Sequence, residues 1–313
     1  MFKDHRENLG LMWRVEPICD VLAKQYGVKI SPSGYYAFKN RPLSNRAKRD
    51  EFLKMMILDI WKENYQCWGV KKVWRALLNK GENVARCSVQ RLMKEMRLCG
   101  LVRGKVKRTT IAGDNAKSPE DLVKRSFSAN APNRLWVADF TYVSTWEGWC
   151  YTAFVTDVYA RRIIGWAVSS RMNEALVTSA FKKAVWTRHR EGHTDLSGII
   201  HHNDKGSQYT ADGFNELLAL HGIRASIGSI GDSYDNALAE TMFGDYKCTL
   251  INNPAKGPWK SREQLETETA KWIHWHNNSN ITEFNNWKTP IEIEEMLYTT
   301  GEDARKCLQK RKV

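Results

Sequence analysis

The sequence lacks any long hydrophobic run: no apolar stretch approaches the roughly 18 residues that a membrane-spanning helix needs. It also lacks a Cys-x-x-Cys pair. Its seven cysteines are scattered and odd in number, which argues against both a zinc site and a disulfide framework. No secretory signal is visible at the start of the chain. These absences predict reduced thiols in a cytosolic protein.

Acidic residues are scarce in the first part of the chain. Residues 1–125 hold 27 Lys and Arg against 13 Asp and Glu, whereas the remainder holds 21 against 22. A strongly basic half suits a polyanion, and nucleic acid is the commonest one, although a merely basic soluble surface is the alternative. With 313 residues, 42% of them hydrophobic, and 13 tryptophans, the chain has material for about two packed domains.

Helical spacing of apolar residues dominates the basic half. Residues 14–40 predict two short helices around a turn at Gly27, with Ser31 and Pro32 as the cap and first position of the second. A longer amphipathic helix is expected over residues 46–64. Its apolar side is predicted to consist of Phe52, Met55, Met56 and Ile60.

A second helix pair is expected over residues 68–98, interrupted at Gly81. The exposed side of its second helix carries Arg86, Arg91, Lys94 and Arg97. A basic helix after a tight turn can enter a major groove, but a helical hairpin with a solvated charged face fits the spacing equally well. A linker rich in breakers is expected over residues 103–134. It opens on a basic run that contains Arg103, Lys105, Lys107 and Arg108.

After residue 135 the pattern becomes strand-like. The predicted order is three strands (136–143, 150–157, 162–168), a helix (175–188), a strand (198–202), a helix (210–220), a strand (223–226) and a helix. This order indicates an α/β fold, a ribonuclease-H-like mixed-sheet core preceded by an all-α region of helix-turn-helix type. In that fold the first and fourth strands are neighbours. Two further helices are expected over residues 261–275 and 289–297.

Three acidic residues have informative positions in this pattern. Asp139 lies within the first strand, Asp204 follows the fourth, and Glu240 lies in the helix that comes next, with 35 residues between Asp204 and Glu240. Each alone reads as a cap or a surface charge. Together, carboxylates from two neighbouring strands and a helix can hold a pair of hard divalent cations, which is what phosphodiester chemistry needs.

The flanks of these acids resemble a known family. The stretches 132–142, 202–210 and 235–240, with the upstream stretch 68–74, resemble bacterial insertion-sequence transposases whose catalytic core is similar to retroviral integrase. The resemblance implies that Asp139, Asp204 and Glu240 bind two Mg²⁺ ions, with Mn²⁺ as substitute. It implies cleavage and joining of double-stranded DNA at the terminal inverted repeats of a mobile element, followed by integration, in the bacterial cytoplasm at the nucleoid. Work at two DNA ends predicts a homodimer or higher oligomer on DNA.

Further DNA contacts are expected around these stretches. Integrase-like cores carry a basic residue where Lys247 stands, seven residues and two helical turns after Glu240. The remaining candidates are Asn236, Lys205, Gln208 and Tyr209 near the acids, and Lys71 and Lys72 upstream. His201 and His202 are interpreted as packing residues rather than metal ligands. The sequence departs from the family pattern at Asn203, where serine is usual, and at Asn280 and Thr282, where arginine and histidine are usual.

The expected organisation is a DNA-binding region (1–102), a linker (103–134), a catalytic core (135–250) and a helical extension with a basic tail (251–313). A competing hypothesis is a non-catalytic DNA-binding regulator of transposition, or a subunit that needs a separately encoded or fused upstream DNA-binding segment, because no long leucine-rich coiled-coil region is visible. A ribonuclease H acting on RNA–DNA hybrid shares the core fold. The basic helical half and the 35-residue interval argue against that third hypothesis.

Overall fold

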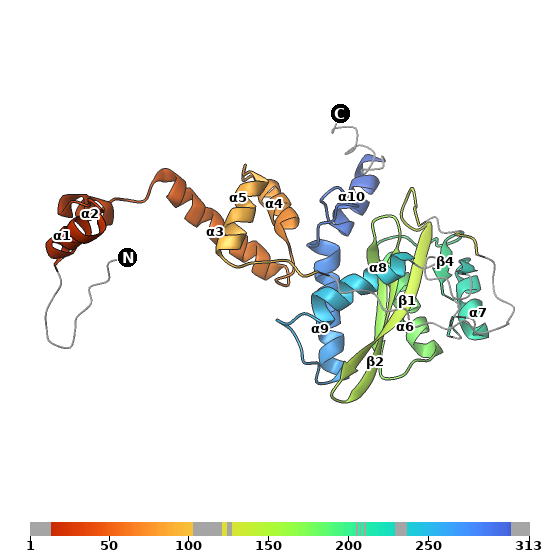
Figure 1. Ribbon diagram of the computed structural model, residues 1–313. Coiled ribbons are helices and arrows are strands. Elements are labelled where there is room, and N and C mark those ends of the chain that lie inside the picture. The colour runs from red at the N-terminus through yellow and green to blue at the C-terminus, as the bar shows by residue number, and fades with distance from the viewer. Residues whose placement is uncertain are drawn as a thin grey trace. The chain divides into compact units, whose positions relative to one another are not determined.

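The computed structural model of the chain divides into two compact units, residues 1–55 and 56–313. It describes residues 14–102, 121–123, 127–204, 206, 208–209, 211–228 and 237–301. The first unit contains α1, α2 and the first part of α3, and the second contains everything that follows (Figure 1). Across the described ranges, no helix is long and apolar enough to cross a membrane.

The first unit begins with the two short helices expected from the sequence. α1 (Val15–Tyr26) ends at Gly27, whose φ of 67° is the left-handed conformation that glycine adopts without a steric penalty. α2 (Pro32–Lys39) begins after Ser31, whose hydroxyl accepts a hydrogen bond from the Gly34 amide at 3.0 Å. The expected cap and first-position proline are therefore confirmed.

α3 (Asn45–Glu63) forms where a helix was expected, but of its predicted apolar side only Ile60 belongs to the core. The buried residues are Leu53, Ile57 and Ile60, at the i, i+4, i+7 spacing of one stripe. Phe52 is 46% exposed and Met55 is 61% exposed. Apolar residues occur on more than one side of this helix, so periodicity alone could not tell which stripe packs inward.

The second unit opens with a helical hairpin. α4 (Val70–Asn79) and α5 (Arg86–Glu95) pack against each other, and Gly81 between them has a φ of 87°. Their fully buried side chains are Val73, Leu77, Val89 and Leu92. The alternation of buried apolar and exposed basic positions in α5 follows the 3.6-residue helical period, as the sequence predicted.

A five-stranded mixed sheet forms the centre of the second unit. The spatial order is β3-β2-β1-β4-β5; β1 pairs antiparallel with β2 and parallel with β4. The strands are β1 (Leu135–Thr145), β2 (Gly148–Asp157), β3 (Arg162–Ser169), β4 (Ile200–Asn203) and β5 (Arg224–Ile227). This is the ribonuclease-H-like order, and it confirms that the first and fourth strands are neighbours.

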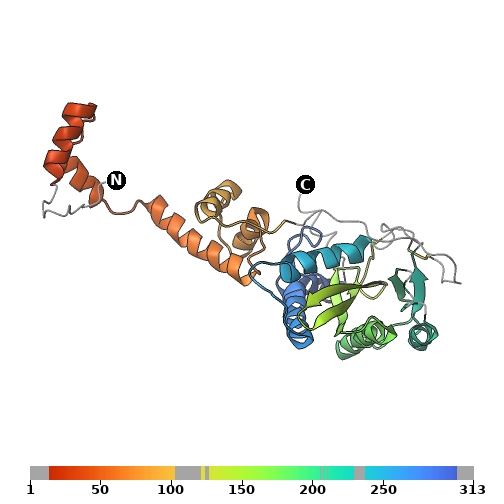
Figure 2. The same ribbon diagram turned by 60° about the horizontal axis from the view of Figure 1, so that its bottom comes forward.

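Helices cover both faces of the sheet. Figure 2 shows α6 and α7 on one face and α8 and α9 on the other. Gly165 of β3 allows the close approach of α6, because a Cβ there would lie 2.2 Å from the Ala180 carbonyl oxygen. The helices are α6 (Glu174–Arg190), α7 (Asp212–Leu220), α8 (Ala237–Tyr246), α9 (Arg262–Asn278) and α10 (Pro290–Thr300).

An aromatic stack fastens α8 and α9 to the sheet. The ring of Phe154 on β2 stacks on Phe243 of α8 at a centroid distance of 4.7 Å and on Trp272 of α9 at 5.9 Å. The Tyr246 hydroxyl forms a 2.7 Å hydrogen bond with Thr269 of α9. Buried rings of this size contribute much of the apolar surface that holds two elements together. The stack therefore sets where α8 lies over the sheet.

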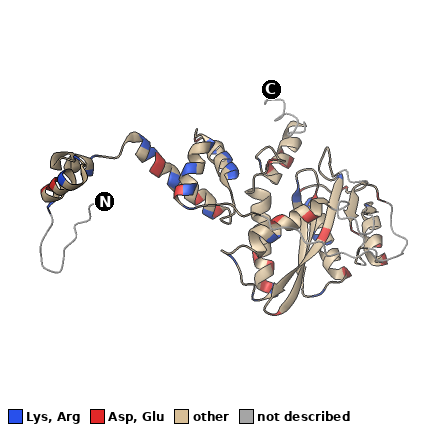
Figure 3. Cartoon of the chain, in the orientation of Figure 1, with Lys and Arg blue, Asp and Glu red and all other residues tan. Residues whose placement is uncertain are grey.

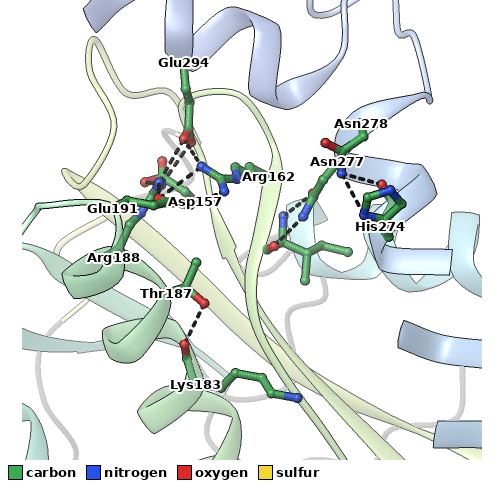
Figure 4. Close-up of polar contacts among 11 residues, drawn as sticks. Asp157, Arg162, Lys183, Thr187, Arg188, Glu191, His274, Asn277, Asn278 and Glu294 are labelled. Carbon is green, nitrogen blue, oxygen red and sulfur yellow. Dashed lines mark hydrogen bonds and ion pairs between the residues drawn. The ribbon is translucent and has the colours of Figure 1, made fainter. Parts of the chain in front are cut away.

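A buried ion network joins α6, α10 and the end of β2 (Figure 4). Arg188 is fully buried and donates to Asp157 at 2.8 Å and to both carboxylate oxygens of Glu294 at 2.8 and 2.9 Å. Arg162 adds a second bond to Glu294 at 2.7 Å and also pairs with Glu191. Burial alone would lower the pKa of Arg188, but the surrounding carboxylates raise it, so the guanidinium stays charged.

Candidate active site

Sheet register places two of the predicted acids side by side. In the parallel pairing of β1 with β4, Ala138 lies opposite Asn203. Asp139 follows Ala138 within β1, and Asp204 follows Asn203, the last residue of β4. Neighbouring strands lie about 4.8 Å apart, which brings the two aspartates within a short distance of each other.

The third acid reaches the same region through the packing of α8. Leu238 and Ala239 of α8 are buried in a cluster with Val137 of β1. The next residue, Glu240, is exposed. One turn further, Phe243 stacks on Phe154, and Phe154 is the cross-strand partner of Asp139. Contacts on both sides of Glu240 therefore hold its part of the helix over the strand that carries Asp139.

The pKa of Asp139 depends on the other two acids. Burial raises its pKa to about 8, and the negative charge of Asp204 contributes in the same direction. The Phe140 amide, which donates to the Asp139 carboxylate at 2.7 Å, lowers the pKa. Glu240 raises it further and Lys247 lowers it. Without a cation, Asp139 therefore holds its proton at neutral pH, because a further negative charge is costly there.

The donor set suits a hard cation. Asp139 is partly buried, whereas Asp204 and Glu240 are exposed, and all three offer carboxylate oxygens. Within the described ranges, no group of three or more His, Cys, Asp or Glu side chains already stands in a metal-holding arrangement. Asp204 and Glu240 are thus close enough to Asp139 to raise its pKa. The three carboxylates do not yet stand in the arrangement that would hold a metal ion. A cation between them would relieve that repulsion.

Lys247 lies beside the acids, but not on the helix expected from the sequence. The α-helical part of α8 ends at Tyr246, and Lys247 opens a π-helical turn over Lys247–Ile251. Burial lowers the pKa of Lys247, and the negative charge of Asp139 partly offsets this. Its Nζ lies 5.0 Å from the centroid of the Tyr142 ring. The charges of Lys247 and Asp139 influence each other, which places this lysine near the acids.

The remaining candidates near the acids occupy different environments. Tyr209 is 3% exposed and packs 6.2 Å from Phe140, with its pKa raised by burial and by Asp139 and Asp204. Its side chain supports the site from within the protein. Gln208 is partly exposed. Lys205 and Asn236 lie outside the described residues.

The two histidines before Asp204 are packing residues in this structure. His201 is fully buried, with its ring 5.5 Å from Phe214 and 5.7 Å from Phe181. The Nδ1 atom of His202 lies 2.9 Å from the Ser226 hydroxyl on β5. Burial lowers the pKa of His201 to about 4.

Acid is expected to weaken the fold through His201. Its pKa of about 4 in the folded state lies below the ordinary value of 6.5, so between these values the unfolded chain binds a proton that the folded chain does not. Its contribution to stability is complete above pH 6.5 and is lost as the pH falls toward 4. Linkage gives a loss of about 2 kcal/mol at pH 5 relative to pH 7. Urea unfolding at both pH values measures it.

The variant His201→Phe provides the comparison for this pH dependence. A phenylalanine fills the same aromatic pocket without a titrating group, so its free energy of unfolding should fall by about 2 kcal/mol less between pH 7 and pH 5. Other buried histidines, such as His276, titrate in both proteins and cancel in the difference. An equal loss in the two proteins would show that His201 does not carry the effect.

The predicted DNA-binding residues of the helical hairpin divide into two groups. Figure 3 shows lysines and arginines gathered on α4 and α5. On α5, Arg86 and Lys94 are exposed, and Arg97 follows the helix, also exposed, whereas Arg91 pairs with Glu95 at 2.7 Å. The basic candidates after residue 102, namely Arg103, Lys105, Lys107 and Arg108, lie outside the described residues.

The two lysines of α4 contact residues near the end of the chain. Lys71 pairs with Glu283 at 2.7 Å, and Lys72 donates to the Asn280 side chain at 2.7 Å. Asn79 at the end of α4 donates to the Trp287 carbonyl at 3.3 Å. α4 is therefore the helix that docks on residues 280–287. Asn280, one of the departures from the family pattern, has a structural role in that contact.

The sequence analysis missed two groups of residues. Phe243 and Phe154 position α8, and the only signal was that Phe243 follows Glu240 by one helical turn. On the β1–β2 hairpin, Tyr142 lies beside Lys247 and meets the ring of Trp149, and both rings are more than half exposed. Large aromatic residues in a strand read as core residues, so nothing in the pattern marked them as surface groups.

Known proteins show the same organisation. The integrase core domain family matches residues 129–233, and an HTH-like domain family matches residues 47–106. The putative transposase for insertion sequence element IS986/IS6110 of Mycobacterium tuberculosis is 51% identical over 86% of this chain and 96% of that protein. The transposase for insertion sequence element IS629 of Shigella sonnei is 44% identical over 91% and 97%. The HTLV-2 integrase catalytic core domain in complex with magnesium is a distant structural likeness, with a TM-score of 0.38 and 17% identity over 52% of this chain and 97% of that one.

The sheet order and the integrase core match define a polynucleotidyl transferase core, preceded by an HTH-like DNA-binding domain. Enzymes with this core depend on divalent cations. The chain belongs to the insertion-sequence transposases. The resemblance stated from the sequence is thereby confirmed, and so is the enzyme class that it implied.

Proposed function

We infer that the chain cuts and joins the ends of its own mobile element at a site formed by Asp139, Asp204 and Glu240, with Mg²⁺ as the cation. The observation that carries this inference is the strand register, in which Ala138 pairs with Asn203 directly before Asp139 and Asp204; the pKa of Asp139, raised by burial and then by both other acids, supports it. A carboxyl group that is kept from ionising by burial, and further by two neighbouring carboxylates, marks a place where a cation is favoured. Metal binding would release the Asp139 proton, so cation affinity should rise as the pH approaches 8.

The chemistry follows from these groups. Divalent cations held by the three carboxylates would supply a Lewis acid that stabilises charge on the attacking and leaving oxygens of the phosphodiester. Asp139 and Asp204, which directly follow the paired residues Ala138 and Asn203, would hold these cations next to each other. Lys247 places a positive charge beside them. A water or a DNA 3′-hydroxyl forms the new P–O bond as the bond to the leaving oxygen breaks, with no covalent bond to the protein.

The rest of the chain supports DNA capture in this proposal. α4 docks on residues 280–287 and α5 presents exposed basic side chains, which suits α5 for the terminal inverted repeats. We retain the division into a DNA-binding region (1–102), a linker (103–134), a catalytic core (135–250) and an extension (251–313). Because two DNA ends must be joined, at least two protomers act together on DNA.

Cleavage of labelled end DNA tests the proposal. The full chain is incubated with DNA that carries the terminal repeat of its element, with Mg²⁺ or with a chelator, and products are resolved by length. Wild type is expected to nick and join in Mg²⁺ alone, whereas Asp204→Asn binds the DNA without cutting it. Equal behaviour of the two proteins, both binding and neither cutting, would favour the regulator hypothesis instead.

Lys94→Ala is expected to weaken binding of end DNA about tenfold at 0.1 M salt, because one phosphate contact and its released counterion are lost. The slope of log affinity against log salt should become shallower by about one. Fluorescence anisotropy across a salt series measures both quantities. Lys182→Ala, which removes an exposed lysine from α6, is the matched control. An unchanged slope for Lys94→Ala would remove this residue from the DNA contacts.

A further inference from the structure

The β1–β2 hairpin carries three large aromatic side chains on the surface. Tyr142 is 54% exposed, Trp146 is 69% exposed and Trp149 is 57% exposed. We name these three residues the aromatic strip. Most other rings of the sheet and its covering helices, such as Phe154 and Trp272, are buried. Exposed aromatic rings contribute little to the core. Three of them on one hairpin form the kind of exposed patch that marks a binding site.

Lysine ammonium groups accompany the aromatic strip. The rings of Tyr142 and Trp149 meet edge to face with centroids 5.3 Å apart. The Nζ atom of Lys247 lies 5.0 Å from the centroid of Tyr142, and that of Lys260 lies 5.6 Å from the centroid of Trp146. Lysines from two other segments therefore lie over two of the three rings. This pairing is what proteins use to hold a polynucleotide strand, with stacking for the bases and positive charge for the phosphates.

The hairpin that presents the strip is held in place. The Trp146 amide donates to the Trp259 carbonyl at 3.0 Å, which ties the hairpin tip to the segment before α9. The Thr145 hydroxyl donates to the Gly148 carbonyl across the turn at 2.8 Å. A base that stacks on Trp146 or Trp149 therefore meets rings on a braced strand pair, so less conformational freedom is lost on binding.

The aromatic strip begins at the candidate active site. Lys247 interacts with both the Asp139 carboxylate and the Tyr142 ring. Tyr142 follows Asp139 by three residues along β1, so their side chains leave opposite faces of the sheet, and Lys247 is the group that interacts with both. A DNA strand whose phosphodiester lies at the acids would pass Lys247 on its way to the rings.

The charges around the hairpin favour nucleic acid over a protein partner. Lys247 and Lys260 lie over the rings, whereas the acidic Glu147 at the tip accepts a hydrogen bond from the Arg262 amide. An apolar protein surface placed on these rings would bury two ammonium groups without counter-charges, which is costly. A duplex offers phosphates but keeps its bases stacked inside, so an unpaired strand is the form that can use the rings and the cations together.

We propose that the aromatic strip binds unpaired bases of DNA next to the phosphodiester that is cut. The inference deepens the proposed transposase function and rests on it for the identity of the strand. It adds a second DNA-binding surface to the basic face of α5, with a different preference: α5 contacts duplex, and the strip contacts a frayed or single-stranded flank.

Binding of a twelve-residue oligothymidine to the full chain tests this proposal. Fluorescence anisotropy is measured in a chelator, so that no cleavage step contributes. Trp149→Ala and Trp146→Ala are each expected to reduce affinity for the oligothymidine by about 5- to 150-fold, the range for loss of one stacked base. Trp149→Phe, which keeps a ring, should retain most of the affinity. Affinity for a duplex of equal length should change less than twofold in all three variants.

Trp186→Ala is the matched control, because Trp186 is 58% exposed on α6 and also carries a cation, with the Arg190 guanidinium 5.1 Å from its ring. It should bind oligothymidine as wild type does. The proposal is overturned if both hairpin variants bind oligothymidine like wild type, or if Trp186→Ala loses as much. It is also overturned if the hairpin variants change only the oligomeric state in light scattering, since the strip would then be a contact between copies.

The outcome separates from that of the proposed function. If the chain cuts end DNA but its hairpin variants bind oligothymidine as wild type does, the transposase function stands and the aromatic strip is not a DNA site. If the chain does not cut DNA but its binding of oligothymidine depends on Trp146 and Trp149, the aromatic strip is a DNA site and the catalytic proposal is wrong. Thermal unfolding of each variant shows whether it is folded, and Trp149→Phe keeps the test valid if Trp149→Ala unfolds.

Discussion

Replacing Asp139 with asparagine is expected to reduce strand cleavage and joining by about 10³-fold or more while leaving DNA affinity within twofold. Asparagine has the same shape, but it cannot supply the negative oxygen that a divalent cation needs between β1, Asp204 and Glu240. End binding depends on exposed basic residues elsewhere, so it should persist. Cleavage of labelled end DNA in Mg²⁺, together with anisotropy in chelator, measures the two quantities on one protein preparation.

The same substitution is expected to stabilise the metal-free protein slightly at pH 8. The pKa of Asp139 is raised to about 8 in the folded state, so the stability it confers is complete at low pH and is lost as the pH rises toward 8. Asparagine removes the group that would ionise there. Asp212→Asn, on the exposed first turn of α7, is the control for a lost surface carboxylate. An Asp139→Asn protein that cuts DNA within tenfold of wild type would contradict the assignment of this site.

Replacing Arg188 with methionine is expected to lower the free energy of unfolding by about 3–5 kcal/mol. Methionine keeps most of the volume but leaves the buried carboxylates of Asp157 and Glu294 without their main partner (Figure 4). An uncompensated buried charge costs more than the ion pair itself contributes. Urea unfolding monitored by circular dichroism measures the change, and the thermal midpoint should fall by about 10 °C.

Two further variants identify the cause of that loss. Arg190→Met removes an exposed arginine two residues away on the same helix and should change stability by less than about 0.5 kcal/mol. Adding Asp157→Asn to Arg188→Met should recover part of the loss, because one of the unpaired charges is then gone. If Arg188→Met unfolds at the same urea concentration as wild type, the network is not what joins α6, α10 and β2.

Most of the core fold could be predicted from the sequence, because strands and helices leave different periods in it. The run around Asp139, the short strand before Asp204 and the helix of Glu240 were each expected close to their observed bounds. Their order along the chain allowed few topologies, and the neighbouring first and fourth strands followed from it. The proximity of Asp139 and Asp204 could therefore be predicted from the sequence.

Side-chain partners could not be predicted in this way. A lysine in α4 reads as a solvated or DNA-binding charge, yet Lys72 binds Asn280, more than two hundred residues later. Arg188 reads as a surface residue of an amphipathic helix, yet it is fully buried. In both cases the deciding partner comes from a distant segment. Local spacing carries no information about such a segment.

The sequence by itself determined the strand and helix order, the basic character of the first part of the chain and the three acids that the catalytic hypothesis needs. Tertiary structure alone decided which stripe of α3 is buried, that α4 is the docking helix, that Asp139 resists ionisation, and that Tyr142, Trp146 and Trp149 stand on the surface beside lysines. The physical reason is the range of the interactions. Hydrophobic periodicity is a property of neighbouring residues, whereas burial, charge coupling and cation–ring contacts depend on atoms that only folding brings together.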